Sequence, residues 1–163
     1  MFSEKLRSLA EAVLAEARAK GLKIATAESC TGGLVAGALT EIAGSSEVFE
    51  RGFVTYSNQA KQDCLGVIAE TLDQFGAVSA QTAVAMAEGA LANSRADLSV
   101  AITGVAGPGG GSPDKPIGLV HFAAARRGRA TLGEVRRFGD LGRDNIRIES
   151  VEVALALLRR QIA

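Results

Sequence analysis

Residues 22–39, LKIATAESCTGGLVAGAL, contain the stretch that decides the fold class. The apolar run LKIATA at 22–27 predicts a short buried strand, and the apolar run that begins at Leu34 and ends at Gly44 predicts a helix. Between them, ESCTGG is polar and rich in glycine, which is typical of a loop. The stretch therefore predicts a strand–loop–helix unit with polar side chains at the end of the strand.

The same pattern occurs twice more along the chain. RGFVTYS at 51–57 has the composition of a strand and runs into the polar segment NQAKQDCLGV at 58–67. ADLSVAITG at 96–104 does the same and runs into the glycine-rich segment AGPGGGSPDKP at 106–116. The sequence thus predicts three strands, each ending in a polar loop.

Helical periodicity fills the remaining segments. Ser3 suits an N-cap for an amphipathic helix over 3–20, and Ser79 suits the same position for a crossover helix over 77–94. Residues 141–163 carry apolar side chains at helical spacing and predict a helix that closes the chain.

Residues 117–139 complete the pattern. Their sequence alternates in the manner of a strand on both sides of the basic turn at 126–129, and it predicts two antiparallel strands joined by a hairpin. Strands that alternate with helices predict a three-layer α/β domain with a mixed sheet. No linker or repeat divides the chain, so we expect residues 1–163 to form a single domain.

Composition excludes several classes of protein. The 163 residues carry 18 Lys and Arg against 18 Asp and Glu, so no net charge draws the chain to nucleic acid or to an anionic membrane. No apolar run approaches the eighteen or so residues needed to span a bilayer, and the N-terminus lacks the pattern of a secretory signal. We expect a cytoplasmic protein that binds neither nucleic acid nor membrane.

Metal and disulfide chemistry are also not expected. The chain has two cysteines, Cys30 and Cys64, without CxxC spacing, and one histidine, His121. These residues cannot assemble a disulfide framework or a usual zinc site, and the fingerprints for nucleoside triphosphates and dinucleotides are missing. We therefore expect no metal and no cofactor, and any chemistry must use other groups.

Ser29 is the first candidate for such chemistry. In open α/β sheets, ligands collect where strands end, and Ser29 lies between a predicted strand and the small residues Thr31, Gly32 and Gly33. Its hydroxyl can act as a nucleophile, with backbone N–H groups near the glycines holding an oxyanion or a phosphate. Alternatively, Ser29 and Thr31 only cap the helix.

A serine nucleophile needs a base, and Lys61 is the better candidate. His121 sits inside an apolar strand, apart from the loops, whereas Lys61 follows the end of the second strand. A cleft wall that desolvates Lys61 would lower its pKa and give a neutral amine. The alternative is a solvated surface lysine.

Cys30 is a rival nucleophile, but neighbouring residues of a strand face opposite ways, so only one of Ser29 and Cys30 can face the cleft. Tyr56, the only tyrosine, can relay protons or orient Lys61, or it is a half-buried aromatic residue. Thr103 and Gly104 end the third strand and can contact a ligand.

The loops taken together carry a resemblance. The chain resembles the CinA C-terminal domain family, whose stand-alone members are similar to nicotinamide-nucleotide amidohydrolases of the PncC type. The resemblance covers nearly the whole chain and rests on five motifs in order: TAESCTGGL at 26–34, GSSEVFERGFVTYSNQAKQDCLGV at 44–67, GAVSAQTAVAMAEGA at 76–90, AITGVAGPGGG at 101–111 and KPIGLVHFA at 115–123.

The resemblance implies a fold and a reaction. The fold is an α/β/α sandwich with about five strands, in a homo-oligomer. The reaction is hydrolysis of the carboxamide of nicotinamide mononucleotide to nicotinate mononucleotide and ammonia, without a metal. The family pattern assigns the nucleophile to Ser29 and the base to Lys61, and it matches Tyr56, Thr103 and Arg143 to active-site positions.

Some alternatives stay open. Arg51, Arg143 and Arg147 are each candidates to meet the substrate phosphate. A different class of function is a noncatalytic nucleotide-binding or partner-docking domain linked to competence or the DNA damage response. Longer members of the family carry a further N-terminal domain with pyrophosphatase chemistry, which we do not expect in this chain.

Overall fold

The protein is built on one mixed sheet of five strands in the order β2-β1-β3-β4-β5. The computed structural model describes residues 1–163. Strands β1, β2 and β3 are parallel to one another, whereas β4 runs antiparallel to β3 and β5 antiparallel to β4. The strands are β1 (Ile24–Glu28), β2 (Phe49–Val54), β3 (Leu98–Gly104), β4 (Leu119–Arg126) and β5 (Leu132–Arg137).

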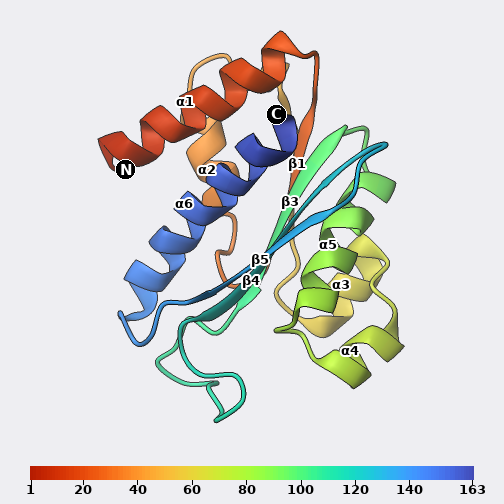
Figure 1. The fold of residues 1–163 in the computed structure, drawn as a ribbon, viewed down its shortest axis with the longest axis vertical. Coiled ribbons are helices and arrows are strands. Elements are labelled where there is room, and N and C mark those ends of the chain that lie inside the picture. The colour runs from red at the N-terminus through yellow and green to blue at the C-terminus, as the bar shows by residue number, and fades with distance from the viewer.

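Helices cover both faces of this sheet, as Figure 1 shows. The first face carries α1 (Glu4–Ala19), α2 (Leu34–Thr40) and α6 (Arg143–Ile162). The second face carries α3 (Asn58–Leu65), α4 (Ala69–Phe75) and α5 (Ala80–Ala92). The three-layer α/β/α sandwich with five strands is therefore confirmed.

The two faces differ in the size of their side chains. Strand alternation turns the large residues Val100, Ile102 and Phe122 toward α1 and α6. It turns small residues toward α5, where Ala101 and Ala123 belong to the second core cluster. Small side chains let α5 lie close to the sheet, so the sheet is covered tightly on the face that also carries α3.

The helix starts follow the predicted caps. The Ser3 hydroxyl accepts from the Leu6 N–H (3.3 Å) and the Ser79 hydroxyl from the Thr82 N–H (3.1 Å). The helix predicted to run to residue 44 ends at Thr40, and a short 3-10 turn, Ser45–Glu47, follows Gly44. Helix α4 was not predicted.

The second strand differs from its prediction in a way that concerns the site. It covers Phe49–Val54 rather than 51–57, because Ser57 leaves the sheet to cap α3, where its hydroxyl accepts from the Ala60 N–H (3.0 Å). Tyr56 therefore lies in the loop between β2 and α3, beyond the end of the strand.

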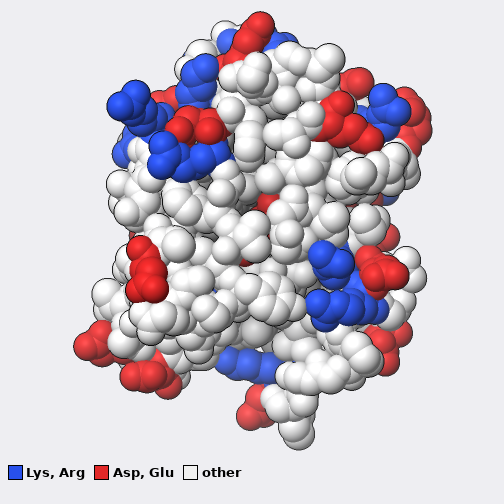
Figure 2. Space-filling model, turned by 180° about the vertical axis from the view of Figure 1, so that it is seen from behind, with Lys and Arg blue, Asp and Glu red and all other residues white.

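None of the helices combines the length and the apolar character that crossing a membrane requires. Figure 2 shows the face opposite to the view of Figure 1, where acidic and basic side chains lie beside one another around the rim and the middle is mostly uncharged. This face offers no extended cationic area for a polyanion.

Candidate active site

The carboxyl ends of β1, β2 and β3 bring the predicted residues together. Ser29 follows β1 directly, and its N–H donates to the carbonyl of Ile102 on β3 (3.0 Å). The Thr55 N–H, just after β2, donates to the carbonyl of Glu28 (2.9 Å). The chain leaves β1 toward one neighbour and returns on the other side of β1 as β3, so Ser29 lies where ligands bind in open α/β sheets.

Ser29 and Lys61 are in direct contact. The Lys61 Nζ lies 3.1 Å from the Ser29 Oγ, although 32 residues separate them. Lys61 belongs to α3, and its side chain is only 1% exposed, so it is not the solvated surface lysine of the alternative interpretation. The half-buried Ser29 hydroxyl and a buried amine form a pair within hydrogen-bonding distance.

The surroundings of Lys61 favour its neutral form. Its Nζ donates to the carbonyl of Thr55 (2.8 Å) and lies 3.4 Å from the carbonyl of Tyr56. Burial lowers the pKa of Lys61, and no carboxylate pairs with it to oppose this effect. A neutral amine has two N–H donors for the two carbonyls and one lone pair, which can accept the proton of the Ser29 hydroxyl.

Cys30 faces the other way. It is 5% exposed and packs within the core cluster on the α1 and α6 face. Burial raises the pKa of its thiol to about 12, so the thiolate is disfavoured. Of the two neighbouring candidates, Ser29 contacts Lys61 and Cys30 is part of the core.

Tyr56 and Arg143 are in contact. The Arg143 Nη2 donates to the Tyr56 hydroxyl (3.0 Å), and its Nη1 donates to the carbonyl of Gly107 (2.8 Å). Tyr56 is 61% exposed, which contradicts the half-buried interpretation. The carbonyl of Tyr56, and not its phenol, lies beside the Lys61 Nζ, whereas the phenol accepts from Arg143.

The loop after β1 is organised around the buried carboxylate of Glu28. Its oxygens accept hydrogen bonds from the Thr31 hydroxyl (2.7 Å) and from the backbone N–H groups of Gly33 (3.1 Å), Val35 (3.0 Å) and Ala36 (2.9 Å). The Gly33 amide is therefore already engaged. The Gly32 amide is engaged as well, because it donates to the carbonyl of Ser29 (3.0 Å).

Two other amides of this loop are left free. The N–H groups of Cys30 and Thr31 donate to no other residue of the protein. The Cys30 amide directly follows Ser29, where a turn amide can hold a negatively charged oxygen, whereas Thr31 is fully buried. The glycines were the expected donors, whereas the remaining candidate donor, the Cys30 amide, precedes them.

Thr103 and Gly104 lie at the carboxyl end of β3. The Thr103 side chain is 1% exposed, and its hydroxyl donates to the carbonyl of Ala77 (2.7 Å). Gly104 leaves no room for a side chain, because a Cβ there would lie 2.7 Å from the Val120 side chain. Both residues therefore join β3 to its neighbours at the end of the strand.

Comparison with known proteins matches residues 6–162 to the family model of the CinA C-terminal domain. The chain belongs to the CinA C-terminal domain family. It is 50% identical over 162 residues to the nicotinamide-nucleotide amidohydrolase PncC of Escherichia coli K12, an alignment that covers 99% of this chain and 97% of that protein.

Other members of the family extend the comparison. The chain is 54% identical over 156 residues to a CinA-like protein of Synechococcus, covering 95% of this chain and 37% of the length of that relative. The crystal structure of the competence/damage inducible protein CihA from Agrobacterium tumefaciens superposes with a TM-score of 0.97 at 56% identity, over 98% of this chain and 97% of that one.

His121 of this CinA C-terminal domain lies nearer to the site than the sequence indicated. It is the partner of Thr103 in the β3–β4 ladder, and its Nδ1 has no hydrogen-bond partner. Burial, together with the charges of Lys115 and Arg137, lowers the pKa of His121. It makes no hydrogen bond with Ser29, so the structure gives that serine a lysine neighbour and no histidine.

Two residues of this CinA C-terminal domain were missed by sequence reasoning. The sequence motifs gave Glu28 no role, and Arg147 was only one of three candidate phosphate ligands. Arg147 donates to the carbonyls of Cys30 (3.1 Å) and Thr31 (3.2 Å), and Arg51 pairs with Glu50. Of the three arginines, Arg143 lies beside Tyr56. An acid directly before a serine, ahead of a glycine-started helix, was the one available signal for Glu28.

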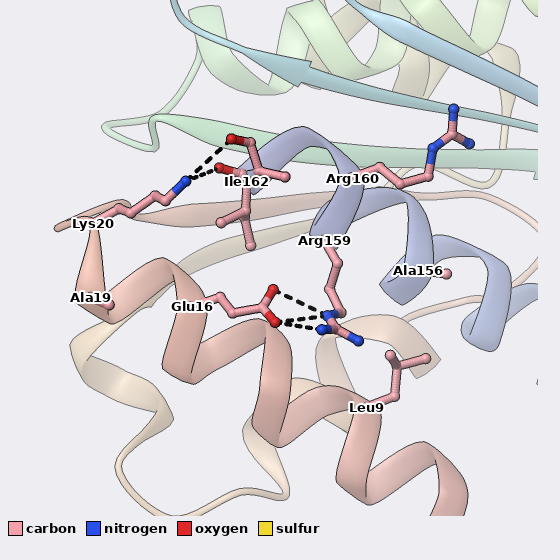
Figure 3. Close-up of a pocket in the computed structure, with 9 residues that line it drawn as sticks. Leu9, Glu16, Ala19, Lys20, Ala156, Arg159, Arg160 and Ile162 are labelled. Atoms are coloured by element: carbon pink, nitrogen blue, oxygen red, sulfur yellow. Dashed lines mark hydrogen bonds and ion pairs between the residues drawn. The ribbon is translucent and has the colours of Figure 1, made fainter.

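A cavity of about 610 Å³ lies elsewhere, between the C-terminal ends of α1 and α6. Figure 3 shows its walls, where Arg159 pairs with Glu16 and Lys20 donates to the carbonyl of Ile162 (2.7 Å). The C-terminal end of α1 leads into the start of β1, whereas Ser29 follows the end of β1. This cavity therefore lies at the opposite end of the strands from Ser29. No group of three His, Cys, Asp or Glu side chains comes together as a metal site.

Proposed function

We propose that this CinA C-terminal domain hydrolyses the carboxamide of nicotinamide mononucleotide to nicotinate mononucleotide and ammonia, a salvage step for pyridine nucleotides. The contact between the Ser29 hydroxyl and the buried Lys61 amine carries the proposal, since it supplies a nucleophile and a base in one pair. The name of the E. coli relative supports the choice of substrate.

The reaction runs in two halves. The Ser29 Oγ attacks the carboxamide carbon while Lys61 takes the hydroxyl proton, and a tetrahedral intermediate forms. Lys61 then returns this proton to the amide nitrogen, and the C–N bond breaks. Ammonia departs, and the nicotinoyl group remains bound to Ser29 as an ester. Water attacks the ester with Lys61 again as base, and nicotinate mononucleotide departs as the serine regains its proton.

The Cys30 amide is the proposed oxyanion donor, because it directly follows the nucleophile and donates to no other residue of the protein. The small residues Gly32 and Gly33 keep this loop open to the substrate. Thr31 is fully buried, and its hydroxyl holds Glu28.

The substrate phosphate is assigned to Arg143. Its side chain is exposed beside Tyr56, which is also exposed, and it has no carboxylate partner. A guanidinium in this state can bind a phosphate in a bidentate manner. Thr103 and Gly104 shape the adjacent floor, and Tyr56 orients Arg143 and, through its carbonyl, Lys61.

The proposed catalytic and binding residues all belong to one sheet, its loops and the helices on it. We therefore propose that residues 1–163 act as one domain. The proposed substrate is a small-molecule nucleotide. The homo-oligomer and the cytoplasmic location stay predictions. Sedimentation of the purified protein at several concentrations measures the first.

The experiment is to incubate purified protein, treated with a chelator, with nicotinamide mononucleotide and to follow ammonia and nicotinate mononucleotide together. Equal release of both products, abolished in Ser29→Ala, is the expected result. If neither product forms at stoichiometric protein concentrations, a noncatalytic nucleotide-binding or docking role in competence or the damage response replaces the proposal.

A further inference from the structure

Two basic side chains of the β4–β5 hairpin lie together on the face of the sheet that carries α5. His121 of β4 pairs with Val135 of β5, and Arg137 pairs with Leu119, two residues before His121. Paired residues of an antiparallel ladder point to the same face, and so do residues two apart in a strand, so His121 and Arg137 are diagonal neighbours, about 7–8 Å apart. Ala123 of the same strand packs in the core cluster beneath α5, which identifies the face.

Lys115 joins these two side chains from the loop before β4. Its Nζ donates to the carbonyl of Phe75 (2.6 Å) in the segment between α4 and α5. Two residues further on, the carbonyl of Ala77 accepts the Thr103 hydroxyl (2.7 Å), and Thr103 is the ladder partner of His121. Residues 75–77 therefore bring Lys115 close to His121. We call Lys115, His121 and Arg137 the basic cluster.

No carboxylate balances the basic cluster. Lys115 and Arg137 belong to no ion pair. Burial lowers the pKa of His121, and the charges that act on it, those of Lys115 and Arg137, lower it further. Glu88 of the covering helix α5 accepts from the Thr131 hydroxyl instead (2.7 Å). Because like charges near one another repel, an anion between them would stabilise the cluster.

The basic cluster also has unused hydrogen-bonding groups. The Nδ1 of His121 is buried and has no partner, which is costly for a ring nitrogen unless a ligand completes the site. The Lys115 ammonium has three N–H donors and gives one to a carbonyl, and the exposed Arg137 guanidinium has five. A phosphate group has several acceptor oxygens and can bind such donors from more than one direction.

The basic cluster is separate from the Ser29–Lys61 pair. The register of β1 with β3, continued by one residue, places Ser29 beside Thr103, and His121 lies beside Thr103 on its other side. Thr103 therefore stands between the nucleophile and the histidine, and its hydroxyl is engaged by the Ala77 carbonyl. An anion at the cluster is thus two strands away from the nucleophile.

We infer that Lys115, His121 and Arg137 form a second anion site, which binds a phosphate group, either free or as a phosphate monoester, apart from the Ser29–Lys61 pair. The inference goes beyond the proposed amidohydrolase function and does not require it. It also leaves the substrate phosphate with Arg143.

The test uses the fact that His121 is the only histidine of the chain, so NMR of the full chain without a tag follows a single imidazole. In phosphate-free buffer, added inorganic phosphate should shift its signals saturably, with a Kd of about 1 mM or below. At saturation the pKa of His121 should rise by about one unit, because a neighbouring anion favours the charged imidazole. A shift that never saturates and equals that of sodium chloride at the same ionic strength would overturn the inference.

The source of the phosphate group is compared by repeating the titration with ribose 5-phosphate. Tighter saturable binding than that of inorganic phosphate supports a phosphate monoester as the occupant, and weaker or equal saturable binding supports the free ion. Saturation by neither compound contradicts the site.

Substitutions connect the signal to the basic cluster. Arg137→Gln and Lys115→Gln should each weaken phosphate binding by about tenfold, because each removes a charged donor. Arg129→Gln, at an exposed position in the turn between β4 and β5, is the matched control and should leave the Kd unchanged. Arg137 is exposed as well, so its loss should not affect folding. The same Kd in Arg137→Gln and Arg129→Gln would show that the cluster does not bind the anion.

Kinetics separate the second anion site from the substrate site. With nicotinamide mononucleotide in phosphate-free buffer, Arg137→Gln should keep KM within about twofold of the wild type, whereas Arg143→Gln should raise it. A KM raised as much by Arg137→Gln as by Arg143→Gln would place the cluster in the substrate site and refute a separate one. Failure of the wild-type protein to release ammonia would refute the proposed function alone, because the NMR titration does not depend on turnover.

Discussion

The Nζ of Lys61 lies 3.1 Å from the Oγ of Ser29, and the same nitrogen donates to the carbonyl of Thr55 at 2.8 Å. The lysine is thus oriented by the backbone that precedes its own helix, while the serine comes from the neighbouring strand. Because the carbonyls carry no full charge, they hold the amine without forcing it into the ammonium form. This arrangement suits a base better than an ion pair would.

The identity of the nucleophile can be tested with two neighbouring substitutions. Ser29→Ala should lower ammonia release by about 10³-fold or more, because no other hydroxyl contacts Lys61. Cys30→Ala should keep activity within a few-fold, since the thiol is buried and its pKa is raised to about 12. Activity that survives the first change and disappears in the second would make the enzyme a cysteine amidase.

The pH dependence of kcat/KM should report Lys61. The base must be neutral to accept a proton, so kcat/KM should fall as the pH drops through the pKa of Lys61. Burial lowers this pKa, and the midpoint should therefore lie below the ordinary value for lysine. Lys61→Arg keeps a cation that cannot become neutral, and it should lose about 10³-fold or more at every pH. Near-normal turnover by that variant would show that Lys61 acts only as a charge.

Stability should also depend on the titration of Lys61. Its pKa is lower in the folded protein than in the unfolded chain, so the unfolded chain binds more protons between the two values. The free energy of unfolding of the wild type, measured against Lys61→Met, should rise with pH in that window, by at most about 1.4 kcal/mol per pH unit. Urea titrations at several pH values measure this difference, and a flat difference would mean that Lys61 is charged in the fold.

Glu28 should be needed for the shape of the loop that presents Ser29. Glu28→Gln puts an amide NH2 among groups that all donate, so we expect a loss of about 2 kcal/mol in the free energy of unfolding and a lower kcat. Glu11→Gln, at an exposed position on α1, is the control and should change neither quantity. Equal behaviour of the two variants in denaturant titration and ammonia release would remove the role given to Glu28.

The packing of α5 against α3 should control the position of Lys61. A Cβ at Gly89 would overlap the carbonyl of Leu65 at the end of α3, so Gly89→Ala must push the two helices apart. We expect a destabilisation of about 1–3 kcal/mol together with reduced turnover. Gly133→Ala on β5 meets no neighbouring atom and provides the comparison, through the midpoint of thermal unfolding and kcat. Loss of stability without loss of turnover would show that α3 keeps its place.

The order of strands and helices was predictable because apolar periodicity and serine caps dominate locally. Helix α4 was not, since only Leu72 of its seven residues is buried and its sequence carries little periodicity. The end of β2 was predicted too late in the chain, because Ser57 caps the start of α3 and does not continue the strand. The strand-like composition around Tyr56 does not show that Ser57 belongs to the helix cap.

The site was partly predictable for a similar reason. Ser29 and Lys61 follow strands whose parallel pairing brings their ends together, and this is a property of the fold class. The roles of Glu28 and Arg147 depend on backbone N–H and carbonyl groups as partners, and these leave no trace in residue identity. Sequence patterns also could not choose among three arginines, because each contacts a different part of the chain.

Strand β2 has a neighbour on one side only, and it pairs with β1 through the register that sets Glu28 beside Val54. The base is attached to this outer strand and the nucleophile to the inner one. Fraying of the sheet margin would therefore separate the two reacting groups while the rest of the core stayed intact. Inactivation under mild stress is then a local event that precedes melting, and residual secondary structure is a poor measure of how much working enzyme is left.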